Sequence, residues 1–205
     1  MDVTSYLLGK QAGGGGGEIN NQNKSITITT NGTTNVTADT GYTGLGTVEI
    51  TTNVGGSAPT LYPYSISFKG DTSSFNLDNI DFSNYGGSSF NDMFRDCSNV
   101  ETLYFKNLTI KPASVKYMFS NCSKLKTGNF DTIDLSDITV TGSMGNMFTG
   151  CSLLTDESLD KILIMCTNCG TTSSLWQIGI RYYDESRIQA LPHYQDFINA
   201  GWTIS

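Results

Sequence analysis

The residues of this chain that could do chemistry are few: five cysteines and a single histidine. Cys166 and Cys169 form a Cys-x-x-Cys pair, a spacing used by thiol redox centres and by half of a zinc site. The pair lies at the end of a predicted helix rather than at its start, and no second pair completes a zinc site. We expect a buried Cys166 and a turn at Cys169, with a redox or metal role as the minor alternative.

Catalytic patterns are weak elsewhere. His193 lies in Pro-His-Tyr, and neither a Gly-x-Ser-x-Gly motif nor an Asp-His pairing surrounds it. Asp131, Asp134 and Asp137 are spaced by three and could gather on a calcium loop, but EF-hand spacing is missing, so a solvated turn is favoured. No carboxylate pair for sugar cleavage stands out. We therefore predict a non-enzymatic protein without a metal or cofactor.

The other three cysteines close three copies of one phrase, Met-Phe-x-x-Cys-Ser, which begins at Met93, Met118 and Met147. The steps between copies are 25 and 29 residues. A period of this size is typical of a solenoid, in which each unit buries its apolar face against the next. The expected interior ladder consists of Met93, Phe94, Cys97, Met118, Phe119, Cys122, Met147, Phe148 and Cys151. Its thiols are expected to be reduced and packed as small hydrophobes; disulfides would require a fitting separation.

A short strand-like run follows each phrase, clearest in Leu103-Tyr104-Phe105-Lys106, where apolar and polar residues alternate. Each Met-Phe segment is expected to form one turn of helix on the side opposite the strands. Outward strand positions Tyr104, Lys106 and Lys126 should then line up, with Trp176 near their C-terminal end. Aromatics beside polar groups suit contacts with sugars or proteins, so these four are the receptor-binding candidates. An ordinary solvated sheet face is the alternative.

The phrase resembles the BspA-like class of leucine-rich repeats, whose unit reads roughly Met-Phe-x-x-Cys-Ser-x-Leu-x-x-Leu-Asp-Leu-Ser-Asn-Phe-Asp-Thr. Residues 80 to 85 fill its strand-and-turn half, and residues 129 to 136 echo it with irregular length. The resemblance covers roughly residues 65 to 169. It implies a leucine-rich-repeat solenoid; repeats of this type serve as recognition surfaces and scaffolds.

Composition narrows the class of partner. A net charge of -7 and a pI near 4.5 argue against nucleic-acid binding, because an acidic surface repels phosphate backbones. No apolar run reaches the length of a membrane span, and the N-terminus does not look like a secretory signal. Relatives of the repeat type are commonly exported bacterial surface proteins. Release of virus particles by lysis is therefore the expected route out of the cell.

The N-terminal region reads as an anchor. Tyr6, Leu7 and Leu8 form an apolar cluster, and five glycines at 13 to 17 follow as a flexible tether. A disordered tail is the alternative. Residues 5 to 10 with the polyglycine resemble the start of tail- and baseplate-associated proteins of phages that infect Firmicutes. Residues 24 to 54 predict a small β-module with a hairpin at Asn31-Gly32.

The remaining elements frame the repeats. Residues 64 to 68 are predicted to form a strand in the first, capping coil, and residues 175 to 180 a last strand. Thr155 should cap a helix whose first turn holds Asp156 and Glu157. Two short helices should follow, broken by Pro192 and ended by Gly201. This closing segment resembles that of Firmicutes phage proteins with such repeats.

Together these features predict an α/β chain: a short leucine-rich-repeat-type solenoid of parallel strands and short helical turns, preceded by a small antiparallel β-module and a Gly-rich tethered peptide. The predicted divisions are residues 1 to 18 for anchor and tether, 19 to 56 for the β-module, 57 to 154 for the solenoid and 155 to 205 for the helical cap.

The predicted function is that of a phage virion protein, attached to the tail or baseplate by its N-terminus and displaying its repeats for host-surface binding. Its expected partners are other virion proteins and a host cell-surface glycan or protein. It would assemble in the host cytoplasm and leave by lysis; homo-oligomerisation stays open. The alternatives are a capsid-attached fibre or decoration protein and a bacterial cell-surface adhesin.

Overall fold

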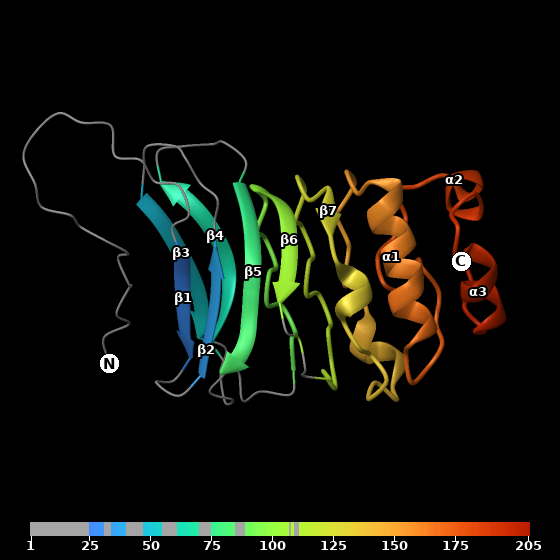
Figure 1. Cartoon of the computed structure of the whole chain (residues 1–205), viewed down its shortest axis with the longest axis horizontal. Coiled ribbons are helices and arrows are strands. Elements are labelled where there is room, and N and C mark those ends of the chain that lie inside the picture. The colour runs from blue at the N-terminus through green and yellow to red at the C-terminus, as the bar shows by residue number, and fades with distance from the viewer. Residues whose placement is uncertain are drawn as a thin grey trace, which may run out of the picture.

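The computed structural model describes residues 89 to 106, 108 and 111 to 205 with their side chains, and five earlier strands by their backbone. The fold mixes helices and strands, as predicted, arranged one after another along the long axis (Figure 1). The strands are β1 (Ser25–Thr30), β2 (Thr34–Asp39), β3 (Thr47–Val54), β4 (Leu61–Lys69), β5 (Phe75–Asn84), β6 (Val100–Lys106) and β7 (Thr127–Gly128). The helices are α1 (Asp156–Thr167), α2 (Glu185–Gln189) and α3 (Tyr194–Asn199), with short 3-10 helices at Phe130–Thr132 and Thr141–Met144.

The main sheet is open and has the strand order β1-β2-β5-β6-β7. Strands β5, β6 and β7 run parallel, whereas β1, β2 and β5 pair antiparallel. The β1–β2 pairing spans the stretch where Asn31-Gly32 predicted a hairpin; the turn itself lies outside the described residues.

The predicted first coil is wrong in its pairing. Residues 64 to 68 lie in β4, which pairs antiparallel with β3 in a separate two-stranded sheet. The register sets Val48 opposite Phe68 and Ile50 opposite Ile66. The strand parallel to β6 is instead β5.

The three Met-Phe segments form turns that stack on one another, and the expected turn of helix is wrong. Alternate backbone N–H groups cross to the next segment: Phe94 donates to the Met118 carbonyl and Phe119 to that of Met147, both at 2.8 Å. The groups between them close their own turn, as when Met93 donates to Phe90 at 3.3 Å. In a regular helix each N–H beyond the first turn bonds to the carbonyl four residues earlier, so a helix could not send alternate N–H groups to a neighbouring segment.

Left-handed residues make this alternation possible. In every Met-Phe segment the residues before Met and before Cys have positive φ; they are Asp92, Asp96, Tyr117, Asn121, Asn146 and Gly150, with φ between 57° and 85°. Asp, Asn and Gly tolerate this conformation better than other residues, which explains five of the six positions. These residues break the helical run that the apolar spacing alone suggested.

A fourth turn stands where a strand was predicted. Residues 175 to 179 form a turn, and Asn146 and Phe148 donate to the carbonyls of Gln177 and Ile178 at 2.9 and 2.8 Å. Gly179 has φ +97° and lies where a Cβ would collide with the Thr149 backbone, which is incompatible with a regular strand. A serine precedes the first apolar residue of all four turns, at Ser89, Ser114, Ser143 and Ser174.

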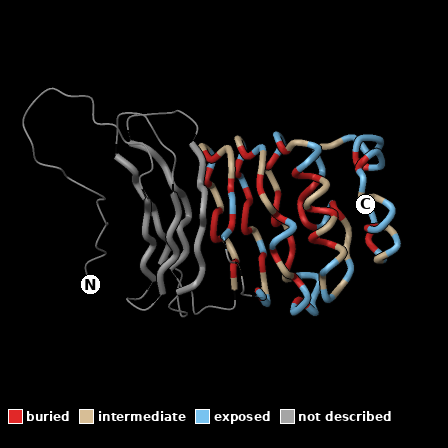
Figure 2. The backbone as a smooth tube through the Cα atoms, in the orientation of Figure 1, coloured by how far each residue is buried: buried red, intermediate tan, exposed pale blue. Residues whose placement is uncertain are grey.

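The interior of the stack is built from the repeated side chains (Figure 2). Every Met, Phe and Cys of the three phrases is buried. The Phe94, Phe119 and Phe148 rings stack in a row, with centroids 5.9 and 5.1 Å apart. Phe130 packs edge-on against two of them, at 5.4 Å from Phe119 and 5.2 Å from Phe148.

Helices close the C-terminal end of the stack (Figure 1). Thr155 caps α1 as predicted, its Oγ1 accepting from the Ser158 N–H at 3.3 Å. Ser158 Oγ in turn accepts from the Gly128 N–H of β7 at 3.3 Å, and the Thr155 N–H donates to the Lys126 carbonyl at 2.9 Å. Helix α1 therefore occupies the edge where another strand could pair. Beyond it, Phe197 and Trp202 are buried around α3.

We expect Phe119→Ala to lower the free energy of unfolding by about 3–5 kcal/mol, because it removes the central ring of the stack and leaves a cavity. Chemical denaturation measures the loss. Tyr182→Ala is the control: this ring is 56% exposed, so its removal should cost about 0.5 kcal/mol or less. Equal losses in the two variants would contradict the buried ring stack.

Candidate functional site

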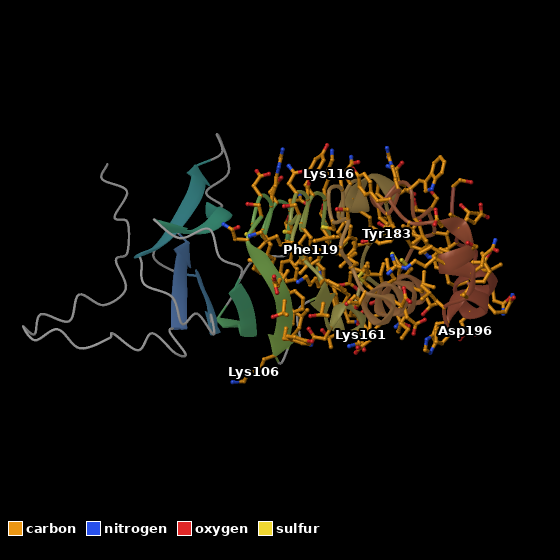
Figure 3. All side chains as sticks on the ribbon, turned by 90° about the horizontal axis from the view of Figure 1, so that it is seen from above. Lys106, Lys116, Phe119, Lys161, Tyr183 and Asp196 are labelled. Atoms are coloured by element: carbon orange, nitrogen blue, oxygen red, sulfur yellow. The ribbon has the colours of Figure 1, made fainter. Side chains whose placement is uncertain are left out.

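The stack presents two opposite outer faces (Figure 3). Lys106 and Lys161 project into solvent on the side that holds the strands and α1. Lys116 projects into solvent on the opposite side, where the turns lie. We call the first the strand face, formed by the outward residues of β6, the start of β7 and α1. We call the second the turn ridge, formed by the outward residues of the four turns.

Three of the predicted receptor-binding residues lie on the strand face. Tyr104 and Lys106 alternate with buried residues of β6, and Tyr104 is 38% exposed. Lys126 lies beside Glu101 at the start of the strand, with Nζ 3.2 Å from the Glu101 carboxylate. Both side chains of this ion pair remain in contact with solvent, and an exposed pair of this kind contributes little stability.

The fourth candidate, Trp176, lies elsewhere. It belongs to the fourth turn, which is joined to the third through the Gln177 and Ile178 carbonyls, so it is part of the turn ridge rather than of the row of strands. Its side chain is 51% exposed. The structure thus separates Trp176 from the other three, because residues 175 to 179 bend as a turn rather than continuing the row of strands.

The first two turns of the ridge hold their polar groups through contacts between turns. Asn91 Oδ1 accepts from Ser114 Oγ at 2.6 Å and from the Lys116 N–H at 2.8 Å. Asn121 Nδ2 donates to Asp96 Oδ1 at 2.7 Å. The Arg95 guanidinium and the Lys116 ammonium each lie 5.2 Å from the Tyr117 ring centroid, a cation–π geometry around this left-handed residue.

The repeated cysteines point inward and have hydrogen-bond partners. Cys122 Sγ donates to the Phe94 carbonyl at 3.0 Å, and Cys151 Sγ to that of Phe119 at 3.1 Å. All five cysteines are free thiols. Burial raises the pKa of Cys122 well above the ordinary thiol value. These thiols therefore have the character of buried packing groups rather than nucleophiles.

The Cys-x-x-Cys pair lies at the end of α1. Cys166 is buried, whereas Cys169 is partly exposed and its Sγ lies 3.3 Å from Met144 Sδ. Desolvation raises the pKa of both thiols, which disfavours the thiolate that redox exchange and metal binding require. Within the described part of the chain, no three His, Cys, Asp or Glu side chains converge in a way that could hold a metal ion.

The lone histidine does have an acidic partner. Asp160 of α1 accepts the His193 backbone N–H at 2.9 Å, and its other oxygen lies 2.7 Å from His193 Nδ1. Sequence analysis missed this pair because 33 residues separate the two. The contacts join α1 to the start of α3.

Asp134, the middle one of the three spaced aspartates, has both a hydrogen-bond partner and an ion-pair partner. Its carboxylate accepts from the Ser136 N–H at 2.9 Å and pairs with Lys111 at 3.0 Å. The hydrogen bonds from Ser136, with help from Lys111, lower the pKa of Asp134 to about 2.

A clasp formed by Tyr183 and Arg187 joins the third turn to the C-terminal helices, and no local pattern in the sequence predicts it. Tyr183 Oη donates to the Cys151 carbonyl at 2.7 Å and accepts from the Leu154 N–H at 2.8 Å. Arg187 lies over the Tyr183 ring at 4.9 Å and pairs with Asp156 at 2.6 Å. Burial raises the pKa of Tyr183 to about 12.

The predicted anchor, Tyr6, Leu7 and Leu8, lies outside the described residues. None of the helices that the structure describes has the length and apolar character needed to cross a membrane. No family model, curated protein or solved structure matches this chain. What the protein does must therefore be inferred from its own residues.

We expect a thiol reagent to label one cysteine per native chain, Cys169, because the other four are buried. Counting labelled thiols by mass spectrometry, before and after denaturation, tests this. Cys169→Ser should leave the native chain unlabelled. Rapid native labelling of Cys122 would contradict the buried ladder.

Because the pKa of Tyr183 is raised in the folded protein, we expect the folded state to lose stability at alkaline pH. Its hydroxyl ionises near 10 when unfolded and near 12 when folded, so the neutral form favours the native state. Its contribution is complete below pH 10 and is lost as the pH rises from about 10 to 12. Tyr183→Phe should lower stability by about 1 kcal/mol at neutral pH and lack this part of the alkaline loss.

Thermal denaturation from pH 7 to 12 provides the measurement. Tyr182→Phe is the matched control, since that ring is 56% exposed and no hydrogen bond of its hydroxyl is part of the clasp. Identical pH profiles for the wild-type protein and Tyr183→Phe would disprove the clasp.

Proposed function

We propose that this chain is a non-enzymatic phage virion protein, attached to the tail or baseplate by its N-terminus and displaying its stacked turns for host-surface binding. The resemblances at residues 5 to 17 and in the closing segment suggest the virion. The repeats suggest recognition, because turns at fixed spacing build an extended surface from a short unit.

The proposal includes the type of repeat. We propose that the stacked turns and parallel strands form a short leucine-rich-repeat-type solenoid. Its support is the Met-Phe-x-x-Cys-Ser phrase together with the alternate hydrogen bonds that link each turn to the next. On this proposal, Ser174 to Gly179 are the start of a fourth unit that has lost the Met-Phe pair.

The observation that best supports N-terminal attachment is the polarity of the stack. Helix α1 covers the edge of β7, and α2 and α3 lie beyond it, so strand pairing cannot continue at the C-terminal end (Figure 1). The opposite end of the main sheet consists of β1 and β2, which follow the proposed anchor in the sequence. We propose that this end, which lies nearest the anchor in the sequence, faces other virion proteins.

Deleting residues 1 to 17 should leave a folded protein that no longer joins the particle, because the described core begins well after this segment. Circular dichroism tests the fold, and immunoblotting of purified particles tests incorporation. Two full-length controls separate anchor from tether: Ser at positions 6, 7 and 8 should abolish incorporation, whereas Ser replacing alternate residues of Gly13 to Gly17 should preserve it.

Normal incorporation of the deletion variant would contradict the anchor. Finding the native chain on capsids instead of tails would favour a decoration protein. Finding it on the bacterial envelope, without particles, would favour the adhesin, the function common among relatives of this repeat type.

A further inference from the structure

We propose that the C-terminal half of the turn ridge is a binding site for an uncharged polysaccharide, with Trp176 as its aromatic platform. We call it the Trp176 site and define it by Asn146, Thr149, Trp176 and Gln177. The inference rests on the proposed host-surface function and specifies both the chemical class of the receptor and the face that binds it.

Trp176 has the features of a preformed platform. Its side chain is 51% exposed, whereas Trp202, the other tryptophan of the chain, is 2% exposed. Its backbone is held on both sides: the N–H donates to the Ile204 carbonyl at 3.1 Å, and the carbonyl accepts from Arg181 Nε at 2.7 Å. A large ring on a fixed backbone loses little conformational freedom when a ligand stacks on it.

Amide and hydroxyl groups belong to the third and fourth turns, which are joined at the residue that follows Trp176. The Asn146 N–H donates to the Gln177 carbonyl at 2.9 Å, which aligns the two residues, and Thr149 Oγ1 donates to Asn146 Oδ1 at 3.2 Å. Gln177 Nε2 lies beside Gly145, 3.6 Å from where a Cβ on that residue would be, so the amide of the fourth turn lies against the third turn. Amides both donate and accept, as sugar hydroxyls do.

The charges on the ridge favour a neutral partner. Arg95 pairs with Asp92 at 2.9 Å, and Lys116 is engaged with the Tyr117 ring. The residues that define the Trp176 site carry no charge, and the net charge of -7 on the whole chain opposes an anionic polymer. Neighbouring turns joined by strand-like hydrogen bonds are spaced at about 4.8 Å, so the ridge suits an extended ligand that itself repeats.

The test is titration of the full chain, labelled with nitrogen-15, with cellohexaose, maltohexaose and chitohexaose, followed by NMR. The two tryptophans give two indole N–H signals, assigned with Trp176→Phe. We expect at least one saccharide to shift the Trp176 signal while the Trp202 signal stays in place. Trp176→Ala should weaken that binding about tenfold or more, whereas Trp176→Phe should keep part of it.

Tyr104→Ala is the matched control, because Tyr104 is an exposed aromatic on the opposite face; it should bind like the wild type. The unmoved Trp202 signal reports that each variant is folded. The inference is overturned if none of the three saccharides binds at millimolar concentration, if only anionic polygalacturonate binds, or if Tyr104→Ala is the variant that loses binding. The virion proposal survives these results, since incorporation into particles tests it separately.

Discussion

The structure depends on two alternating kinds of backbone hydrogen bond, one within each turn and one between neighbouring turns. In the three Met-Phe turns, alternate groups close the turn and the groups between them reach the next turn. Neither set is sufficient alone: a segment that used all its donors internally would be an isolated helical turn, and such short helices are marginal in water. Left-handed residues at two fixed positions per turn produce the alternation.

The hydrogen bonds between turns explain why equivalent side chains line up, both in the interior and on the turn ridge. Once the turns are in register, equivalent side chains must stack, so Phe94, Phe119 and Phe148 form a row and the thiols of Cys122 and Cys151 find carbonyl groups of the preceding turn. The outward positions are aligned by the same bonds. A surface of aligned outward residues therefore follows from the backbone pattern.

Much of the interior could be predicted from the sequence because it repeats. The buried Met, Phe and Cys positions follow from three copies of one phrase, and Thr155 with its acidic first turn predicts α1. The conformation of the turns could not be predicted in this way, since apolar spacing in Phe90, Met93 and Phe94 fits a helix and the left-handed residues between them carry only a weak signal.

Contacts between residues far apart in the sequence could not be predicted either. Asp160 with His193, and Tyr183 with the Cys151 carbonyl, are separated by 33 and 32 residues, and nothing local marks either pair. The fourth turn was hidden because it lacks Met-Phe and Cys; only the serine at its start and the apolar residues after it match the other three. Trp176 was accordingly predicted to lie in a last strand, whereas it belongs to a turn.

Native-state hydrogen exchange resolved by residue tests the alternation most directly. The account predicts that the amides of Phe94, Phe119 and Phe148, which bond to the next turn, are strongly protected and exchange together, in the same cooperative opening as the interior. The amides of Met93, Met118 and Met147, which close their own turns, set the comparison within the same segments. If the three phenylalanine amides exchanged rapidly and independently while the interior stayed folded, the turns would not be joined in this way, and the central claim would be wrong.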